Sequence, residues 1–247
     1  MKDRPRPVAV VTGAAGGIGT AIASHLAQRG YDLVLTDQRG CDSIAVALRS
    51  SSVTVHAEPC DFNSADAIGV FTSSVLERFH HVDILINNAA YMRPIPFRDL
   101  DLETLRRFER INVEAAFLLI KAFQPGMAER GWGRILNMVS GSAWAPPPAF
   151  TAYVTTKMAL LGLTRQLAVE FGGCGITVNA LTPSLTKHFN SGDALPDEMY
   201  AAVAQRQAIK RVAVPEDILG AVTFLISTEA AFMTGQTLSC DGGLVFL

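Results

Sequence analysis

Two residues with complementary acid–base chemistry lie four positions apart in a stretch that favours a helix. Tyr153 and Lys157 would share one face of that helix. A phenol with a pKa of about 10 is a poor acid or base at neutral pH, and a cation beside it favours the phenolate and lowers that pKa. The pair predicts a general acid/base tuned by an ammonium group. An ordinary amphipathic helix could also place these residues together without any chemistry.

A glycine-rich run near the start of the chain has the spacing of a phosphate-binding turn. Residues 12–19 read Thr-Gly-Ala-Ala-Gly-Gly-Ile-Gly, between the apolar run Val8–Thr12 and helical spacing from Ile18 to Arg29. Glycine lets the backbone approach a pyrophosphate, and the first helical turn supplies free N–H groups. Asp37 ends the next apolar run, where a carboxylate accepts hydrogen bonds from ribose hydroxyls and repels a 2′-phosphate. This predicts NAD rather than NADP, with Arg39 as the contrary signal because it could face a phosphate.

Short apolar runs alternate with helical patterns along the whole chain, and these elements must position the residues above. The expected strands are 8–12, 32–36, 53–56, 82–86, 133–139, 176–181 and 237–239; the expected helices are 18–29, 42–49, 64–79, 102–127, 153–171 and 215–227. Strands joined by such helices form a parallel sheet, doubly wound because its crossovers are right-handed. We therefore expect an α/β fold of Rossmann type, with seven parallel strands in one domain over residues 1–247. Ligands should bind beyond the carboxyl ends of the strands.

The composition excludes several classes of function. The 247 residues are 49% hydrophobic and 18% charged with a formal charge of −2, which excludes disorder and gives no basic excess for nucleic acid or an anionic membrane. Two long uncharged stretches, 8–28 and 135–156, are interrupted by glycines or prolines, and no signal peptide is indicated. The four cysteines are far apart, and neither they nor the histidines have metal-ligand spacing. We expect a cytoplasmic protein with no metal, no membrane and no nucleic-acid partner.

Over essentially its whole length, the sequence resembles the compact branch of the short-chain dehydrogenase/reductase family. The motifs that carry the resemblance are, in chain order, Thr12–Gly19, Cys60-Asp61, Asn87-Asn88-Ala89-Ala90, Asn112, Ser140 with Tyr153 and Lys157, Asn179 with Pro183, and Gly235-Gln236 with Asp241-Gly242-Gly243. The resemblance implies the strand order 3-2-1-4-5-6-7, a nicotinamide cofactor, and hydride transfer at a carbinol or carbonyl carbon. It also implies a homo-oligomer, a tetramer or a dimer, built through helices 102–127 and 153–171 and the C-terminal strand.

The same resemblance implies roles for individual residues. Tyr153 would be the general acid/base, Lys157 would bind the nicotinamide ribose and tune Tyr153, Ser140 would hydrogen-bond the substrate oxygen, and Asn112 would hold a water in the proton relay. Ser142 is a rival for the serine role, but the family's spacing and the strand end favour Ser140. Cofactor contacts are implied at Gly13, Gly17, Ile18, Gly19, Asp37, Asp61, Phe62, Asn88, Ala89, Tyr153, Lys157, Pro183 and Thr186. Asp61 and Asn88 could also do no more than cap loops.

Two positions depart from the family pattern. Ser184 follows Pro183 where the family often has glycine, and His188 stands where a threonine often contacts the nicotinamide carboxamide. These departures leave the chemistry intact but affect the local geometry of the segment 184–206. We expect this segment to act as a lid that is weakly ordered around residues 187–195, with Phe189 in contact with bulky substrates.

The variable loops near the predicted site are apolar and aromatic. They contain Tyr91, Met92, Trp144 and Phe150, which favour a small-molecule substrate that is a hydrophobic or aromatic ketone or secondary alcohol. Half of these residues could instead simply pack the loops. Ile95-Pro96-Phe97 and the runs 121–127 and 131–135 add a narrower likeness to NAD-dependent 1-phenylethanol-type dehydrogenases.

Two other functions remain open. A 3-oxoacyl-thioester reductase would favour NADPH and an acidic carrier partner, and Asp37 argues against it. A catalytically silent NAD-binding regulatory protein is the second alternative, and the intact set of Ser140, Tyr153 and Lys157 argues against that one.

Overall fold

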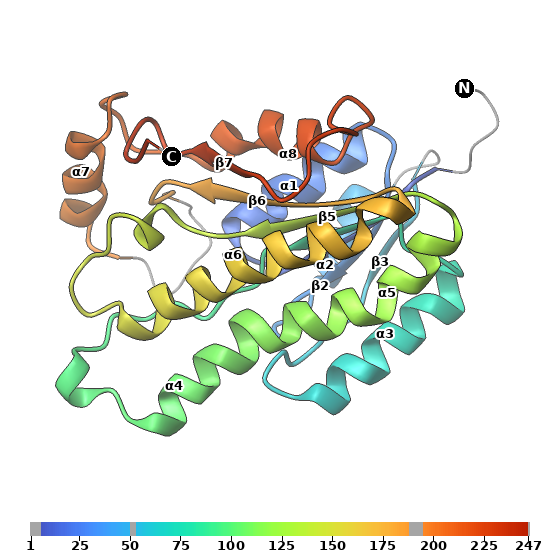
Figure 1. Cartoon of the computed structure of the whole chain (residues 1–247), viewed down its shortest axis with the longest axis horizontal. Coiled ribbons are helices and arrows are strands. Elements are labelled where there is room, and N and C mark those ends of the chain that lie inside the picture. The colour runs from blue at the N-terminus through green and yellow to red at the C-terminus, as the bar shows by residue number, and fades with distance from the viewer. Residues whose placement is uncertain (1–5, 50–52, 188–194, 247) are drawn as a thin grey trace.

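Figure 1 shows the computed structural model of the chain, which describes residues 6–49, 53–187 and 195–246. Seven parallel strands form one sheet in the order β3-β2-β1-β4-β5-β6-β7. The strands are β1 (Val8–Thr12), β2 (Asp32–Thr36), β3 (Val55–Ala57), β4 (Ile84–Asn87), β5 (Gly133–Met138), β6 (Ile176–Pro183) and β7 (Thr237–Cys240). The predicted Rossmann-type sheet and its strand order are confirmed, and every strand lies within two residues of its predicted bounds.

Helices cover both faces of the sheet. They are α1 (Gly17–Gln28), α2 (Asp42–Leu48), α3 (Ala65–Phe79), α4 (Leu102–Glu109), α5 (Ala115–Glu129), α6 (Thr151–Phe171), α7 (Asp197–Arg206) and α8 (Leu219–Leu225). One face carries α1, α2 and α8, and the other carries α3, α5 and α6 (Figure 1). Val11 packs into the first layer and its neighbour Val10 into the second. Because both faces are buried, β1 is a continuous apolar run rather than an alternating one.

The structure differs from the predicted helices in two places. The expected continuous helix 102–127 contains a π turn, Arg110–Glu114, between α4 and α5. This turn holds Asn112, whose side chain bonds to groups outside the helix, and such contacts are not visible in a helical repeat. The second difference is α7, which lies in the segment expected to be only a lid. Pro196 is its N-cap, and Asp197 and Glu198 in its first turn favour a helix start.

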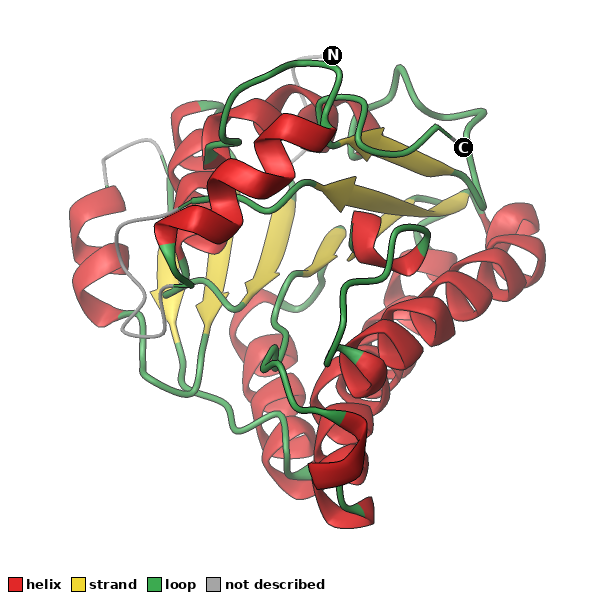
Figure 2. Cartoon of the chain, turned by 90° about the vertical axis from the view of Figure 1, so that its left-hand side faces the viewer, coloured by secondary structure: helices red, strands yellow, loops and turns green. Residues whose placement is uncertain are grey.

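The loops that follow the strands gather at one edge of the sheet, which faces the viewer in Figure 2. This is the edge where the sequence predicts ligand binding. Residues 188–194, which include His188 and Phe189, lie outside the described residues. The structure therefore does not describe most of the part of the lid, 187–195, that was expected to be weakly ordered. Across residues 6–49, 53–187 and 195–246, no helix has the length and apolar character needed to span a bilayer.

Candidate functional site

The glycine turn after β1 is held together by backbone contacts that only glycine permits. Gly13 has φ +65°, and its carbonyl oxygen accepts a hydrogen bond from the N–H of Gly16 at 3.1 Å. A Cβ on Gly19 would lie 2.2 Å from that same oxygen, and a Cβ on Gly13 would lie 2.8 Å from Cα of Ala89. The first turn of α1 starts at Gly17 and leaves its N–H groups without partners in the helix. This is a cradle that fits a phosphate group.

Thr12 connects the glycine turn to the loop after β4. Its hydroxyl oxygen accepts hydrogen bonds from the backbone N–H groups of Asn88 and Ala89, both at 2.9 Å. The Asn88 side-chain amide donates to the carbonyl oxygens of Thr12 at 2.9 Å and Gly13 at 3.2 Å. The Asn88 side chain therefore caps a loop, which was the alternative to a cofactor contact in the sequence analysis. The backbone of Asn88 still lies beside the glycine turn that is predicted to bind the cofactor.

Asp37 is buried directly after β2, next to the glycine turn. The N–H of Ala14 donates to the carbonyl oxygen of Thr36 at 3.1 Å, which brings the two loops together. The Asp37 carboxylate accepts hydrogen bonds from the backbone N–H of Arg39 at 3.1 Å and from its Nε at 3.3 Å. Arg39, the contrary signal in the sequence, is thus paired with the carboxylate in the structure.

Asp61 and Phe62 follow β3 and differ in their exposure. The exposed Asp61 carboxylate accepts the backbone N–H of Asn63 at 2.9 Å, so it caps the loop before α3. Phe62 is buried in the layer of α3, α5 and α6. The structure thus gives each residue a role in the protein itself, and their contacts with a cofactor remain predictions.

The first turns of α6 bring Tyr153 and Lys157 together in the interior. Lys157 Nζ donates a hydrogen bond to the carbonyl oxygen of Met138 at 2.8 Å and lies 5.5 Å from the centroid of the Tyr153 ring. Burial lowers the pKa of Lys157 to about 8. Burial also raises the pKa of Tyr153 to about 12, and a hydrogen bond with Ser140 acts in the opposite direction.

The expectation that the nearby cation lowers the pKa of Tyr153 is therefore wrong for the free protein. Both groups are enclosed, with Tyr153 8% and Lys157 2% exposed. Desolvation disfavours each charged form, and for the phenol it outweighs the hydrogen bond with Ser140, which favours the phenolate. Tyr153 is consequently a neutral phenol at pH 7.

Ser140 lies two residues beyond β5 and caps a short 3₁₀ turn, Gly141–Ala143. Its hydroxyl oxygen accepts hydrogen bonds from the backbone N–H of Ser142 at 3.2 Å and from the Ser142 hydroxyl at 2.9 Å. Together with its hydrogen bond to Tyr153, this places Ser140 at the phenol end of α6. The two rival serines therefore belong to one hydrogen-bonded unit.

Asn112 is buried in the π turn and links three segments. Its Oδ1 accepts the N–H of Tyr91 at 2.7 Å, and its Nδ2 donates to the carbonyl oxygen of Tyr91 at 3.0 Å and to the Thr156 hydroxyl at 2.9 Å. Thr156 in turn donates to the carbonyl oxygen of Tyr153 at 2.8 Å. Thr156 was missed by the sequence interpretation, although its position three residues after Tyr153 places it on the same buried helix face.

The loop after β6 explains how serine is accommodated where the family often has glycine. The Ser184 hydroxyl donates to the buried side-chain oxygen of Gln207, and the Thr186 hydroxyl donates to the carbonyl oxygen of Ser184 at 3.0 Å. Pro183 is the last residue of β6. Gln207, just after α7, was also missed, because its partner lies 23 residues away in the sequence.

A turn near the C-terminus supports the loop that follows β5. The buried Asp241 carboxylate accepts hydrogen bonds from three successive backbone N–H groups, those of Gly243, Leu244 and Val245, at 3.0 to 3.1 Å. A Cβ on Gly141 would lie 3.6 Å from this carboxylate and 3.6 Å from Leu244. The C-terminal turn therefore packs directly against the 3₁₀ turn that Ser140 caps.

The aromatic residues of the variable loops partly pack against each other. The Tyr91 ring lies 4.6 Å from that of Phe108, and Phe150 meets Tyr153 edge-on at 6.1 Å between centroids. Met92 is exposed and Trp144 is half-buried. Tyr91 and Phe150 thus stabilise the loops, which leaves Met92 and Trp144 as the freer candidates for contact with a substrate. Within the part of the chain that the structure describes, no cluster of three His, Cys, Asp or Glu residues could hold a metal ion.

Comparisons with known proteins agree with this fold. A family model described as enoyl-(acyl carrier protein) reductase matches residues 13–245. A short-chain dehydrogenase/reductase of Armillaria gallica is 34% identical over 250 residues, covering 97% of this chain and 96% of that protein. A cis-4-hydroxycyclohexanecarboxylate dehydrogenase of Sinomonas cyclohexanicum is 35% identical, covering 96% and 95%. The crystal structure of a putative short-chain alcohol dehydrogenase from Sinorhizobium meliloti superposes with a TM-score of 0.90 at 29% identity, covering 98% and 97%.

Proposed function

Because the chain belongs to the short-chain dehydrogenase/reductase family of nicotinamide-dependent oxidoreductases, we propose that it transfers a hydride between NAD(H) and a secondary alcohol or ketone. The observation that carries the proposal is the group formed by the buried Tyr153 and Lys157 and the half-buried Ser140 at the carboxyl edge of the sheet. That group lies at the same edge as a glycine cradle suited to a phosphate. A single catalytic domain over the whole chain is part of the proposal and is supported by the one continuous sheet.

The bound nicotinamide ring supplies or accepts the hydride. In ketone reduction Tyr153 gives its phenolic proton to the substrate oxygen, and its raised pKa keeps that proton in place at neutral pH. Ser140 donates a hydrogen bond to the same oxygen. Lys157 holds its ammonium group near the phenol ring, where it favours the phenolate left behind.

The cofactor would lie along the residues that follow β1, β2, β3, β4 and β6. Gly13, Gly17, Ile18 and Gly19 would hold the pyrophosphate, and Asp37 the adenosine ribose. The remaining proposed contacts are those of Asp61, Phe62, Asn88, Ala89, Pro183 and Thr186. The preference for NAD is supported by the buried Asp37 carboxylate, which keeps Arg39 engaged and would repel a 2′-phosphate. In this scheme Asn112 fixes the loop after β4 against α6 and would hold a water in the proton relay.

We propose a hydrophobic or aromatic substrate, in keeping with the exposed Met92 and the half-buried Trp144 in the loops that follow β4 and β5. The relative that acts on cis-4-hydroxycyclohexanecarboxylate supports a ring-bearing alcohol. The narrower likeness to 1-phenylethanol-type dehydrogenases stays a prediction. A carrier-bound acyl reductase is the second candidate, favoured by the description of the matching family model, and Asp37 weighs against the NADPH use we would expect of it.

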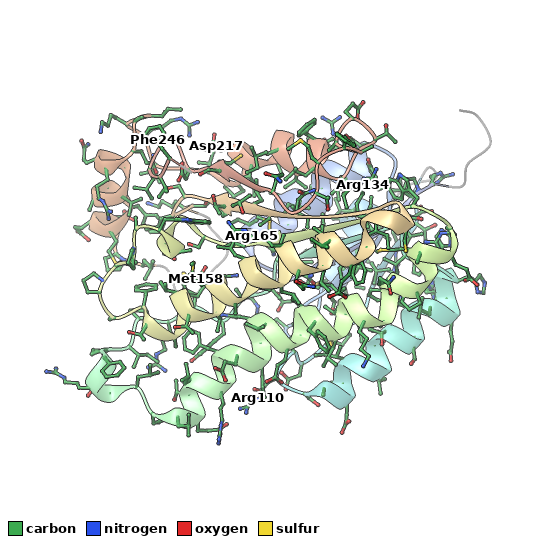
Figure 3. The ribbon with its side chains drawn as sticks, in the orientation of Figure 1. Arg110, Arg134, Met158, Arg165, Asp217 and Phe246 are labelled. Atoms are coloured by element: carbon green, nitrogen blue, oxygen red, sulfur yellow. The ribbon has the colours of Figure 1, made fainter. Side chains whose placement is uncertain are left out.

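A homotetramer in the cytoplasm completes the proposal. Family members are usually oligomeric, and exposed apolar side chains lie on the helices expected at the interface, namely Phe117 on α5 and Met158 on α6. Phe246 near the C-terminus is 86% exposed and forms a second apolar position (Figure 3). Four free cysteines support a reducing compartment. Light scattering should give a mass well above the 26.5 kDa of one chain.

A panel of cyclic, aromatic and aliphatic ketones and alcohols, read by absorbance of NADH and NADPH, tests the function. We expect Tyr153→Phe to lower turnover by about 10²- to 10⁴-fold while cofactor affinity is retained, because the ring still packs but has no proton to transfer. The matched control is Tyr31→Phe, because Tyr31 directly precedes β2 and so lies at the amino ends of the strands, away from the proposed site. Near-normal turnover in Tyr153→Phe would contradict the proposal, and so would cofactor binding without turnover of any substrate in the panel.

A further inference from the structure

The Ser140 hydroxyl oxygen is occupied as an acceptor by a single neighbouring residue. The backbone N–H of Ser142 donates to it at 3.2 Å, and the Ser142 hydroxyl donates to it at 2.9 Å. A serine hydroxyl has two lone pairs and one proton. Two accepted hydrogen bonds use both lone pairs, so only the O–H of Ser140 remains available, and it can act only as a donor.

The direction of the bond between the two hydroxyls decides what Ser140 can offer a substrate. If Ser140 donated to Ser142 instead, its proton would point away from Tyr153, and it could present only a lone pair. A ketone oxygen accepts hydrogen bonds but cannot donate one, so that arrangement would repel it. Over the described residues, the Ser142 hydroxyl makes no other side-chain hydrogen bond, so its proton is free to serve Ser140.

We propose that Ser142 is a positioning residue that turns the Ser140 proton toward Tyr153 and the substrate oxygen. The inference rests on the function proposed above, in which Ser140 hydrogen-bonds that oxygen. In reduction, negative charge develops on the substrate oxygen, and in oxidation it lies on the Tyr153 phenolate. A Ser140 proton held between them by Ser142 stabilises the charge in either direction.

The 3₁₀ turn keeps the two serines in this geometry. The Ser140 side chain caps the turn by accepting the backbone N–H of Ser142, so this contact does not need the Ser142 hydroxyl. Gly141 between them packs against the C-terminal turn at Asp241 and Leu244. Removing only the Ser142 hydroxyl therefore preserves the turn and its packing, and leaves one lone pair of Ser140 free. The Ser140 proton can then rotate away from the reacting oxygens.

Three variants test the inference with the best substrate and cofactor from the panel. Ser142→Ala removes the second donor, Ser142→Thr keeps a hydroxyl, and Ser73→Ala removes an exposed serine hydroxyl on α3 as the matched control. We expect Ser142→Ala to lower kcat for ketone reduction by about 2- to 12-fold, the loss that corresponds to one neutral hydrogen bond, with cofactor affinity and Tm unchanged. Ser142→Thr should restore most of the rate.

The pH profile of alcohol oxidation supplies a readout that a purely structural role would not move. The Ser140 donor favours the phenolate, so in Ser142→Ala the apparent pKa of the rising limb should shift upward by about 0.4 to 1.1 relative to wild type and Ser73→Ala. An unchanged rate and pH profile would overturn the inference, and so would a Ser142→Thr variant that is no better than Ser142→Ala. Ser140→Ala separates the two claims: full activity there would overturn the role proposed for Ser140, whereas its impairment beside an unaffected Ser142→Ala would overturn only the inference.

Discussion

Replacing Gly19 with alanine would place a methyl carbon 2.2 Å from the carbonyl oxygen of Gly13 and 2.8 Å from Cα of Ala14. Both neighbours are backbone atoms of the turn, so no side chain can rotate away to relieve the clash. An ordinary carbon–oxygen contact is longer by about 1 Å, and the turn must therefore move away from α1 by roughly that distance. The perturbation tests whether the cofactor cradle depends on this close approach.

The magnitude follows from comparing two glycines that both lie inside helices. Overpacking costs about 1–3 kcal/mol, and the 2.2 Å approach to a backbone oxygen puts Gly19 at the upper end, about 2–3 kcal/mol. Alanine returns about 1 kcal/mol of helix propensity, which leaves a net loss of about 1–2 kcal/mol. At Gly69 in α3 nothing lies within 4 Å of the added Cβ, so Gly69→Ala should stabilise the protein by about 0.5–1 kcal/mol. For a chain of this size we expect Tm to fall by about 2–8 °C in Gly19→Ala and to rise in Gly69→Ala.

Cofactor affinity provides the second measurement. A displaced turn loses at least one N–H hydrogen bond to a phosphate, and a hydrogen bond to a charged group contributes about 1.5–3 kcal/mol. Fluorescence titration with NADH should therefore show Kd raised by roughly 10- to 150-fold in Gly19→Ala and unchanged in Gly69→Ala. Wild-type affinity and an unchanged Tm in Gly19→Ala would refute the assignment of this turn as the cofactor cradle.

Two further changes address cofactor choice and buried charge. Asp37→Ala should free Arg39 to face a 2′-phosphate and raise the ratio of kcat/KM for NADPH over NADH by roughly 10- to 100-fold. Asp42→Ala removes an exposed carboxylate nearby and should leave this ratio unchanged. An unaltered ratio in Asp37→Ala would show that the carboxylate does not select NAD. The buried Lys157 loses its proton at pH about 8 in the folded state but only near 10.5 when unfolded, so the unfolded chain binds more protons between these values and stability rises with pH there. Wild type should gain up to about 3 kcal/mol over Lys157→Met between pH 8 and 10.5, measured by denaturant unfolding, and a constant difference would contradict the buried charge.

The elements and order of the sheet could be predicted from the sequence because the signals are local. Residues 8–11 are apolar throughout, and a parallel strand buried on both faces favours such a run. Gly30, expected to cap the first helix, has φ +83° directly after the helix end at Arg29. The glycine turn was likewise identified by its spacing between a strand and a helix.

What could not be predicted depends on partners that are distant in the sequence. The π turn exists where Asn112 bonds to Tyr91 and Thr156, 21 and 44 residues away. Ser184 is held by Gln207, and neither residue signals the other in any repeat. The pKa of Tyr153 was predicted to move in the wrong direction, because a residue pair on a helix does not reveal how deeply both groups are buried.

The π turn at Arg110–Glu114 also affects how the chain could change by insertion and deletion. A π turn holds one residue more than the α-helical repeat, and each residue in a helix advances by about 100° around the axis. Deleting one residue there would restore a regular helix and turn Asn112 away from Tyr91 and Thr156. Such a shortened helix would be locally more stable, but it would release the loop after β4 from α6. A chain selected for stability alone would therefore tend to lose the extra residue of the π turn, whereas a chain selected for turnover would keep it.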